Sequence, residues 1–147
     1  GQNGREYKII KFRTMRKDAE SDGIARPAAE NDQRVTRVGR ILRKSHLDEL
    51  PQFINVLKSE MSLVGPRPER PELIEKLQTK VPFYRARQFV KPGVTGWAQV
   101  NFHYASTVED TAVKLEYDLY YIKHRNLLLD ITILIRTVGA AIGLRGQ

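Results

Sequence analysis

Two adjacent carboxylates, Asp48 and Glu49, lie in a stretch of the chain that also carries closely spaced arginines. Arg43 precedes the pair by five residues, and Arg67 follows it between two prolines. A carboxylate can attack phosphorus or hold a metal ion, and an arginine binds phosphate oxygens through paired hydrogen bonds. These residue types at this spacing indicate chemistry on a phosphate group.

The acid pair also has a purely structural interpretation. Ser45 and Asp48 have the spacing of a helix capping box, and acidic residues are common in the first turn of a helix. The neighbouring polar residues favour a functional role, because burying Arg43, Gln52 and Asn55 beside a core face without a partner costs free energy. A bound anion or metal ion would supply that partner.

Two further features of the cations suit phosphate binding. Each proline beside Arg67 fixes its own φ and restricts the residue before it, which argues for a fixed direction of the guanidinium rather than a mobile surface arginine. Lys11 and Arg13 lie two positions apart in a strand expected over residues 7–13, so both side chains would share one face. That face suits either solvent or a wall of the phosphate site.

Helical patterns surround the acid pair. Residues 34–44 carry an arginine at every third position and are expected to form a helix with one basic stripe, which is equally typical of a solvated face. Residues 45–58 predict a second helix that kinks or restarts at Pro51. Its apolar side chains recur at helical spacing and are expected to face the core: Leu47, Leu50, Ile54 and Leu57.

The whole pattern predicts one α+β domain that is mostly helical and has a few short strands. Short strands are expected over residues 61–64 and 98–100. Further helices are expected over residues 71–80, from a capping box at Thr107, and over the apolar residues 127–144.

Composition narrows the range of partners. The 147 residues carry a net charge of +8, which predicts an anionic partner such as nucleic acid, anionic lipid or a phosphorylated substrate. Cysteine is absent, so disulfides and thiolate metal sites are excluded. No dinucleotide-binding, P-loop or serine-elbow pattern occurs, and no run reaches the roughly 18 uncharged apolar residues of a membrane span.

Four separated stretches carry a resemblance to one family. They read KFRTM at 11–15, TRVGRILRKSHLDELPQFINVLKSEMSLVGPRPE at 36–69, KPGVTGWAQVN at 91–101, and KLEYDLYYI with LLLDITILIRTV within 114–138. In this order they resemble the catalytic domain of the bacterial sugar transferases, the monotopic phosphoglycosyl transferases, and most of all the exopolysaccharide-type members. The resemblance covers nearly the whole chain, residues 1–147.

The resemblance implies an enzyme that transfers a sugar-1-phosphate from a UDP-sugar to polyprenyl (undecaprenyl) phosphate and releases UMP. This reaction begins the synthesis of exopolysaccharides, O-antigens and glycoconjugates. Asp48 would be the nucleophile that forms a phospho-aspartate, and Glu49 would hold Mg²⁺. Asp118 matches a family acid near the nucleotide or the metal. The full set of candidates for phosphate or substrate binding is Lys11, Arg13, Arg43, Gln52, Arg67 and Asp118.

The resemblance also implies a membrane partner, at the cytoplasmic face of the bacterial inner membrane. Family members have an N-terminal re-entrant membrane helix, and this chain is expected to begin just inside the catalytic domain and to be compatible with a soluble form by itself. Residues 127–144 are expected at the membrane interface. Glucose or galactose is the favoured sugar, while N-acetylated sugars and a homo-oligomer stay open.

The chain departs from the family pattern at two places. Ser59 and Glu60 stand where the family usually has Gly-Asp, and the loop after Asn101 is longer than in the smallest members. Two other classes of protein compete with the enzyme: a basic nucleic-acid-binding module and a non-catalytic membrane-surface scaffold. The lack of a nucleic-acid-binding motif and the intact acid pair favour the enzyme over both.

Overall fold

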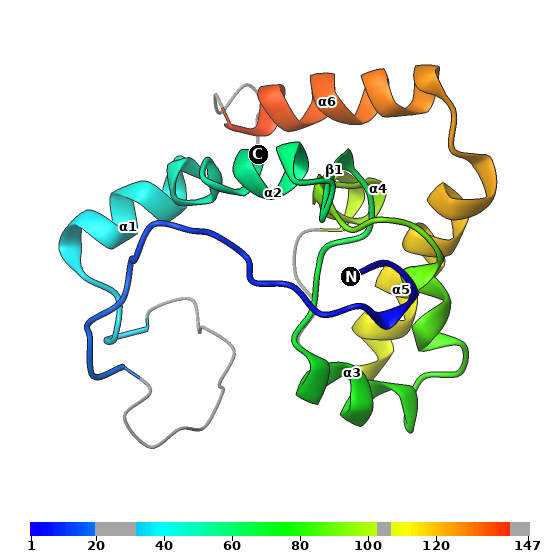
Figure 1. Ribbon diagram of the computed structural model, residues 1–147, viewed down its shortest axis with the longest axis horizontal. Coiled ribbons are helices and arrows are strands. Elements are labelled where there is room, and N and C mark those ends of the chain that lie inside the picture. The colour runs from blue at the N-terminus through cyan, green and yellow to red at the C-terminus, as the bar shows by residue number, and fades with distance from the viewer. Residues whose placement is uncertain (20–31, 103–106, 142–147) are drawn as a thin grey trace. The chain divides into compact units, whose positions relative to one another are not determined.

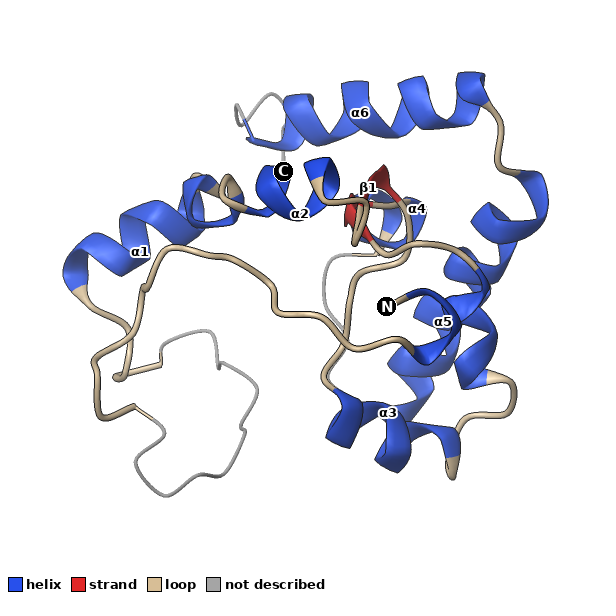
Figure 2. Cartoon of the chain, viewed as in Figure 1, coloured by secondary structure: helices blue, strands red, loops and turns tan. Residues whose placement is uncertain are grey.

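The computed structural model describes residues 1–19, 32–102 and 107–141. Helices dominate these ranges, and their one sheet consists of two three-residue strands (Figure 2). The expected mostly helical α+β class is therefore confirmed. The chain divides into a larger unit, Gly1–Ile9 with Gln52–Gln147, and a smaller unit, Ile10–Pro51. The assignment of residues 1–147 to one catalytic domain stays a prediction.

The smaller unit contains α1 (Arg37–Lys44), which confirms the helix expected over residues 34–44. Thr36 ends the preceding segment, and its hydroxyl caps the helix by accepting a 2.9 Å hydrogen bond from the amide of Gly39. Because the helix begins only at Arg37, Arg34 lies outside it and forms a 2.6 Å ion pair with Asp32. The basic stripe is therefore shorter than expected.

The strand expected over residues 7–13 does not form. The nearest β-type pairing is an isolated antiparallel bridge between Met15 and Val35, and the amide of Thr36 donates to the carbonyl of Thr14 at 3.0 Å. A strand needs a neighbouring strand to share its backbone hydrogen bonds, and residues 7–13 have none among the residues that the structure describes.

The helix expected over residues 45–58 is interrupted. A one-turn 3-10 helix, η2 (Leu47–Glu49), is followed by α2 (Gln52–Leu57), with Pro51 directly before the restart. The restart at Pro51 was one of the two sequence-based alternatives, and the missing amide of proline explains it.

The expected inward face of that helix is wrong. Leu57 is 86 % exposed, and the other three apolar side chains, Leu47, Leu50 and Ile54, are also exposed. The buried side chains of α2 are instead Gln52 and Asn55. Asn55 is fully buried because its amide donates to the carbonyl of Lys8 at 2.8 Å and to the carboxylate of Glu60 at 2.7 Å. Periodicity reveals that a helix has two faces, but polar partners elsewhere in the chain decide which face is buried.

The sheet of the larger unit pairs β1 (Ser62–Val64) with β2 (Gly93–Thr95) in parallel. The strand expected over residues 61–64 is confirmed, whereas residues 98–100 lie in α4 (Trp97–Asn101) and not in a strand. β2 instead falls in the glycine-rich segment before Trp97. A Cβ atom on Gly93 would lie 2.1 Å from the amide nitrogen of Gly65, so only glycine permits this close approach of the two segments.

The helices predicted from Pro71, from the capping box at Thr107 and over residues 127–144 all form in the larger unit (Figure 1). Thr107 and Asp110 form the expected reciprocal capping box. The structure describes the apolar C-terminal helix as far as Ala141, and residues 142–144 of the expected range lie outside the described residues. The elements of this unit besides α2, α4 and the strands are η1 (Gln2–Gly4), α3 (Pro71–Gln78), η3 (Tyr84–Phe89), α5 (Val108–His124) and α6 (Leu127–Ala141).

The α5 helix takes part in two apolar clusters. Near its start, Leu115 packs with Ile74, Val81 and Tyr84 of the α3 and η3 region. Near its end, Tyr121 packs with a second cluster under α6, whose other buried members are Val64, Val100 and Ile133. None of the helices within residues 1–19, 32–102 and 107–141 has the length and apolar content that a membrane-crossing helix needs.

The departure from the family pattern at Ser59 has a clear backbone consequence. Ser59 has φ of 61°, in the left-handed region that glycine enters with least cost. Glu60, the second departure, keeps a structural role because its carboxylate accepts the hydrogen bond from Asn55. The residue types differ from the family pattern here, but the turn is one that a glycine would favour.

Candidate active site

The two acidic residues lie on η2, immediately after α1. The amide of His46 donates to the carbonyl of Arg43 at 3.1 Å, and His46 has φ of 55°. A residue in this left-handed conformation commonly ends a helix, so the chain leaves α1 here and turns at once into η2. Asp48 is 9 % exposed. The predicted nucleophile is therefore held in a short, defined turn.

An extended segment of residues 11–14 lies along this turn. The amide of Phe12 donates to the carbonyl of Asp48 at 3.0 Å, and the ammonium of Lys11 forms a 3.0 Å ion pair with Glu49. Arg13 is exposed, and no side-chain hydrogen bond or ion pair joins it to any residue that the structure describes. The structure thus brings Lys11, Asp48 and Glu49 together, while Arg13 stays at the surface.

Thr14 fixes the position of Arg43. The hydroxyl of Thr14 accepts a 2.8 Å hydrogen bond from Nε of Arg43, and its carbonyl accepts a 3.2 Å bond from the hydroxyl of Thr36. A Cβ atom on Gly39 would lie 2.1 Å from the carbonyl oxygen of Thr14, so α1 and this segment touch backbone to backbone. Sequence reasoning missed Thr14 as a site residue, although it lies within the KFRTM stretch.

This part of the smaller unit can support phosphate chemistry. Asp48 offers a carboxylate, and Lys11 and Arg43 offer cations that offset the repulsion between a carboxylate and an anionic phosphate. Glu49 offers the oxygen ligand that Mg²⁺ prefers, and Mg²⁺ commonly uses one or two carboxylates together with substrate phosphates. Among the described residues no group of three acidic, histidine or cysteine side chains could enclose a metal ion. A carboxylate beside a phosphate-binding cation fits Mg²⁺ as an ion shared with a phosphate-bearing substrate.

Arg67, predicted to bind phosphate, lies in the larger unit on the loop after β1. Two backbone carbonyl groups of this loop accept hydrogen bonds, both at 2.9 Å. The carbonyl of Pro66 accepts from the amide of Gly93, and the carbonyl of Arg67 accepts from Nη2 of Arg87. The backbone of this arginine is therefore fixed by hydrogen bonds as well as by its two prolines.

Asp118 lies in a buried ion pair and not at an open surface. Its carboxylate is 2.8 Å from Nη2 of Arg87, and Asp118 is 2 % exposed. Glu69 joins the same cluster, since its carboxylate lies 3.8 Å from Arg87 and 3.6 Å from Lys114. No spacing in the sequence connects Arg87 with Asp118, which lie 31 residues apart, so sequence reasoning missed Arg87.

Burial controls the electrostatics of this cluster. Desolvation raises the pKa of Asp118 although Arg87 opposes the shift, and desolvation lowers the pKa of Lys114 against the attraction of Glu69. Desolvation likewise raises the pKa of Tyr84 to about 12. The hydroxyl of Tyr84 accepts a 2.8 Å hydrogen bond from Arg87, so the arginine is held from two sides.

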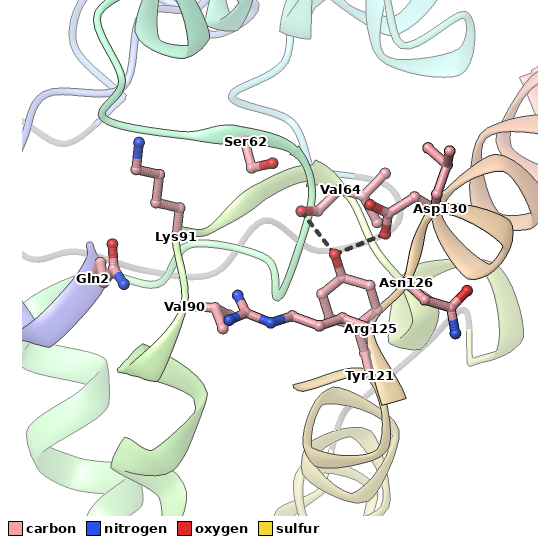
Figure 3. A pocket seen from close by; sticks show the side chains of 10 residues that line it. Gln2, Ser62, Val64, Val90, Lys91, Tyr121, Arg125, Asn126 and Asp130 are labelled. Carbon is pink, nitrogen blue, oxygen red and sulfur yellow. Dashed lines mark hydrogen bonds between the residues drawn. The ribbon is translucent and has the colours of Figure 1, made fainter. Parts of the chain in front are cut away.

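Gln52, the remaining predicted binding residue, is buried at the start of α2 in the larger unit. A separate cavity of about 500 Å³ opens in the same unit (Figure 3). Its lining includes Lys91, Arg125 and Tyr121, whose hydroxyl lies 2.9 Å from a carboxylate oxygen of Asp130. None of the predicted site residues lines this cavity.

The sequence corresponds to a known family of proteins. The family described as "Bacterial sugar transferase" matches residues 1–143 of the chain, and the chain belongs to this family. The resemblance drawn from the four sequence stretches is therefore confirmed.

Individual relatives show the range of reactions within the family. The chain is 48 % identical over 138 residues to the UDP-N-acetylgalactosamine-undecaprenyl-phosphate N-acetylgalactosaminephosphotransferase of Aeromonas hydrophila, covering 94 % of the chain and 32 % of that protein. It is 43 % identical over 145 residues to the UDP-glucose:undecaprenyl-phosphate glucose-1-phosphate transferase of Xanthomonas campestris pv. campestris, covering 97 % and 30 %. It is 36 % identical over 156 residues to the UDP-galactose-lipid carrier transferase of Erwinia amylovora, covering 97 % and 31 %. The chain thus spans about a third of the length of these relatives.

Proposed function

We propose that this chain carries the catalytic residues of a transferase that moves a sugar-1-phosphate from a UDP-sugar to undecaprenyl phosphate. One observation carries the proposal: Asp48 and Glu49 share a single turn, with Lys11 3.0 Å from Glu49. Arg43, anchored on Thr14, adds a second cation to the same unit. The names of the relatives support the donor and acceptor classes.

In the proposed first step, a carboxylate oxygen of Asp48 attacks the phosphorus that bears the sugar. The bond from this phosphorus to the oxygen of the UMP phosphate breaks, and UMP leaves with the electron pair. The sugar phosphate is then joined to Asp48 as an acyl phosphate. Lys11 and Arg43 would stabilise the negative charge on the phosphate oxygens, which is the main task of a protein in phosphoryl transfer.

In the proposed second step, a phosphate oxygen of undecaprenyl phosphate attacks the same phosphorus. The bond to Asp48 breaks, the carboxylate is restored, and undecaprenyl-diphospho-sugar leaves. Glu49 would hold Mg²⁺, which when bound neutralises charge on the diphosphate. Arg67, whose backbone is held by hydrogen bonds to its own carbonyl and to that of Pro66, would bind another phosphate oxygen through its guanidinium.

The acceptor is a lipid, and the larger unit has apolar surface suited to a membrane. The α6 helix leaves a row of exposed apolar side chains, namely Leu127, Leu128, Ile131, Leu134, Ile135 and Val138. The α2 helix likewise exposes Phe53, Ile54 and Leu57. Apolar helix faces next to basic residues favour the interface of an anionic membrane. We therefore propose that the protein lies at a membrane interface, which the family resemblance implies is the cytoplasmic face of the bacterial inner membrane.

The first test measures UMP release by the full-length natural protein with Mg²⁺, undecaprenyl phosphate and a panel of UDP-sugars. The panel contains UDP-glucose, UDP-galactose and their N-acetylated forms, because the names of the relatives include three of these sugars. We expect release with one preferred donor and loss of more than about a thousandfold in Asp48→Asn. The matched control is Asp18→Asn, which changes an exposed acid of the same unit.

A trapping experiment separates the covalent route from direct transfer. With donor labelled in the sugar phosphate and no acceptor, the proposal predicts labelled protein in the wild type and in Asp18→Asn but not in Asp48→Asn. Full activity of Asp48→Asn would rule out this residue as the nucleophile. UMP release that needs undecaprenyl phosphate in the first turnover, with no labelled protein, would instead indicate direct transfer.

A further inference from the structure

The buried ion pair between Arg87 and Asp118 is the most constrained polar feature of the larger unit. The two side chains are 5 % and 2 % exposed, and Nη2 of Arg87 lies 2.8 Å from the carboxylate. Nε of Arg87 has no hydrogen-bond partner among the residues that the structure describes. Removing two charges from water is costly, and a well-packed apolar pair often gives equal or greater stability. Stability alone therefore does not account for this pair.

The contacts of Arg87 lead to the loop of residues 65–69, here called the Arg67 loop. The same Nη2 that binds Asp118 donates to the carbonyl of Arg67 at 2.9 Å. Nη1 donates to the hydroxyl of Tyr84 and lies 3.8 Å from the carboxylate of Glu69. One guanidinium thus reaches the Arg67 loop at two places while its carboxylate partner on α5 holds it still.

The Arg67 loop is also held from the opposite end. Pro66 accepts a hydrogen bond from Gly93, and Gly65 donates to Thr95, both at 2.9 Å. The sheet therefore fixes the residues before Arg67, and Arg87 fixes the carbonyl after it. With Pro66 and Pro68 restricting the backbone torsions, little freedom remains in the backbone of Arg67, which fixes the point at which its side chain leaves the loop.

We infer that Arg87 and Asp118 are positioning residues that aim Arg67 at the phosphate of the donor. Asp118 acts through Arg87 and the Arg67 carbonyl and makes no contact with the donor itself. This inference rests on the proposed function, in which Arg67 binds a donor phosphate. It explains why Asp118, which the family resemblance led us to expect near the nucleotide or the metal, is buried against an arginine.

The test is a double-mutant cycle on the full-length natural protein, with KM for the preferred UDP-sugar and kcat measured separately. We expect Arg67→Ala to raise KM roughly tenfold, and Arg87→Lys to raise it by a similar factor. Lysine keeps the charge but cannot bind the Arg67 carbonyl and Asp118 with the geometry of the arginine fork. The double variant is expected to be no worse than Arg67→Ala alone. Multiplication of the two effects would overturn the inference.

A control separates positioning from general loss of stability. Ile133→Ala removes a fully buried side chain of α6 from the apolar cluster of Val64, Val100 and Tyr121, which contains no residue of the Arg67 loop and no hydrogen-bond partner of Arg87. Its melting temperature should fall while KM stays at the wild-type value. A KM increase in Ile133→Ala as large as that in Arg87→Lys would show that KM follows stability, which also overturns the inference.

Two further variants, Glu69→Gln and Asp48→Asn, complete this set of kinetic tests. If Arg87→Lys does not fold, Glu69→Gln replaces it, because this half-buried residue contacts Arg87 only at 3.8 Å and its loss loosens the same loop. If Glu69→Gln leaves KM unchanged while Arg67→Ala raises it, the inference about Arg87 and Asp118 is overturned but the proposed function is not. Unchanged kinetics in both Asp48→Asn and Arg67→Ala would instead contradict the proposed function.

Discussion

The ammonium of Lys11 lies 3.0 Å from a carboxylate oxygen of Glu49, although 38 residues separate them in the chain. This contact joins a proposed phosphate-binding cation to the proposed ligand of Mg²⁺. The side chains are 37 % and 13 % exposed, so the ion pair is partly screened by water and is worth little stability. A weak pair of this kind can open when a metal ion and a phosphate bring each partner a stronger interaction.

The first prediction concerns competition between Lys11 and Mg²⁺ for Glu49. Lys11→Met removes the cation, so we expect the Mg²⁺ concentration for half-maximal UMP release to fall about two- to fivefold, the factor that corresponds to a partly exposed ion pair. The KM for the UDP-sugar should rise, because a phosphate contact is lost. Titrations of Mg²⁺ at saturating donor measure the first effect.

The control for this experiment is Lys17→Met, which removes an exposed cation of the same unit. It changes the net charge by the same amount and should leave both constants at their wild-type values. A higher Mg²⁺ requirement in Lys11→Met would contradict the competition and assign Lys11 to metal-dependent substrate binding alone.

The second prediction concerns the contact between α1 and the segment that carries Lys11. In Gly39→Ala the new Cβ would lie 2.1 Å from the carbonyl oxygen of Thr14 and 2.8 Å from its carbon, so the backbone must move apart. We expect a loss of about 1–3 kcal/mol in the free energy of unfolding and a lower kcat, because Arg43 loses its alignment with Thr14.

Gly139→Ala is a matched control, since a Cβ at this position of α6 would meet nothing within 4 Å. Alanine should stabilise that helix by up to about 1 kcal/mol and leave kcat unchanged. Denaturant unfolding of both variants measures the difference. Equal stability of the two variants would mean that the backbone contact at Gly39 is not made in solution.

The third prediction tests the reversed faces of α2. Asn55→Leu removes the side-chain amide that donates to the carbonyl of Lys8 and to the carboxylate of Glu60. We expect a loss of about 1–3 kcal/mol in the free energy of unfolding, because these two acceptors lose their donor. Ile54→Gln, one residue away on the exposed face, should change it by less than about 0.5 kcal/mol. If Ile54→Gln is the more damaging change, the buried face of α2 has been assigned wrongly.

The fourth prediction follows from the raised pKa of Tyr84, which burial moves from 10.0 to about 12. Between these two values the folded protein holds the phenolic proton while the unfolded chain has released it. The stability that this proton contributes is complete below pH 10 and is lost as the pH rises toward 12, by at most about 3 kcal/mol.

Urea unfolding of the wild type and of Tyr84→Phe across this range provides the measurement. The variant loses an acceptor for Arg87 and should be less stable at every pH, but its stability should fall less steeply above pH 10. The same slope in both proteins would show that other groups cause the alkaline loss.

Much of the chain could be understood from local sequence. The capping box at Thr107, the helix opened by Pro71, and the restart after Pro51 all depend on interactions within one turn, and all three are present. The family resemblance rests on contiguous stretches, so it too is readable without a structure, and the match over residues 1–143 confirms it.

The errors occurred where a segment depends on distant partners. The strand expected over residues 7–13 has no partner strand among the residues that the structure describes. β2 forms at glycines because Gly93 closely approaches Gly65. The buried face of α2 was decided by the carbonyl of Lys8, which lies 47 residues before Asn55. No periodicity within a helix contains that information.

The sequence by itself determined the family, the acid pair and the helices with strong local signals, because residue type and short-range spacing are sufficient for each. The tertiary structure alone decided that Lys11 meets Glu49, that Thr14 holds Arg43, and that Asp118 is buried against Arg87. These contacts join residues 29 to 38 positions apart. Such pairs form only when the packing of whole elements brings them together, since the free-energy cost of closing each loop is offset by many contacts at once.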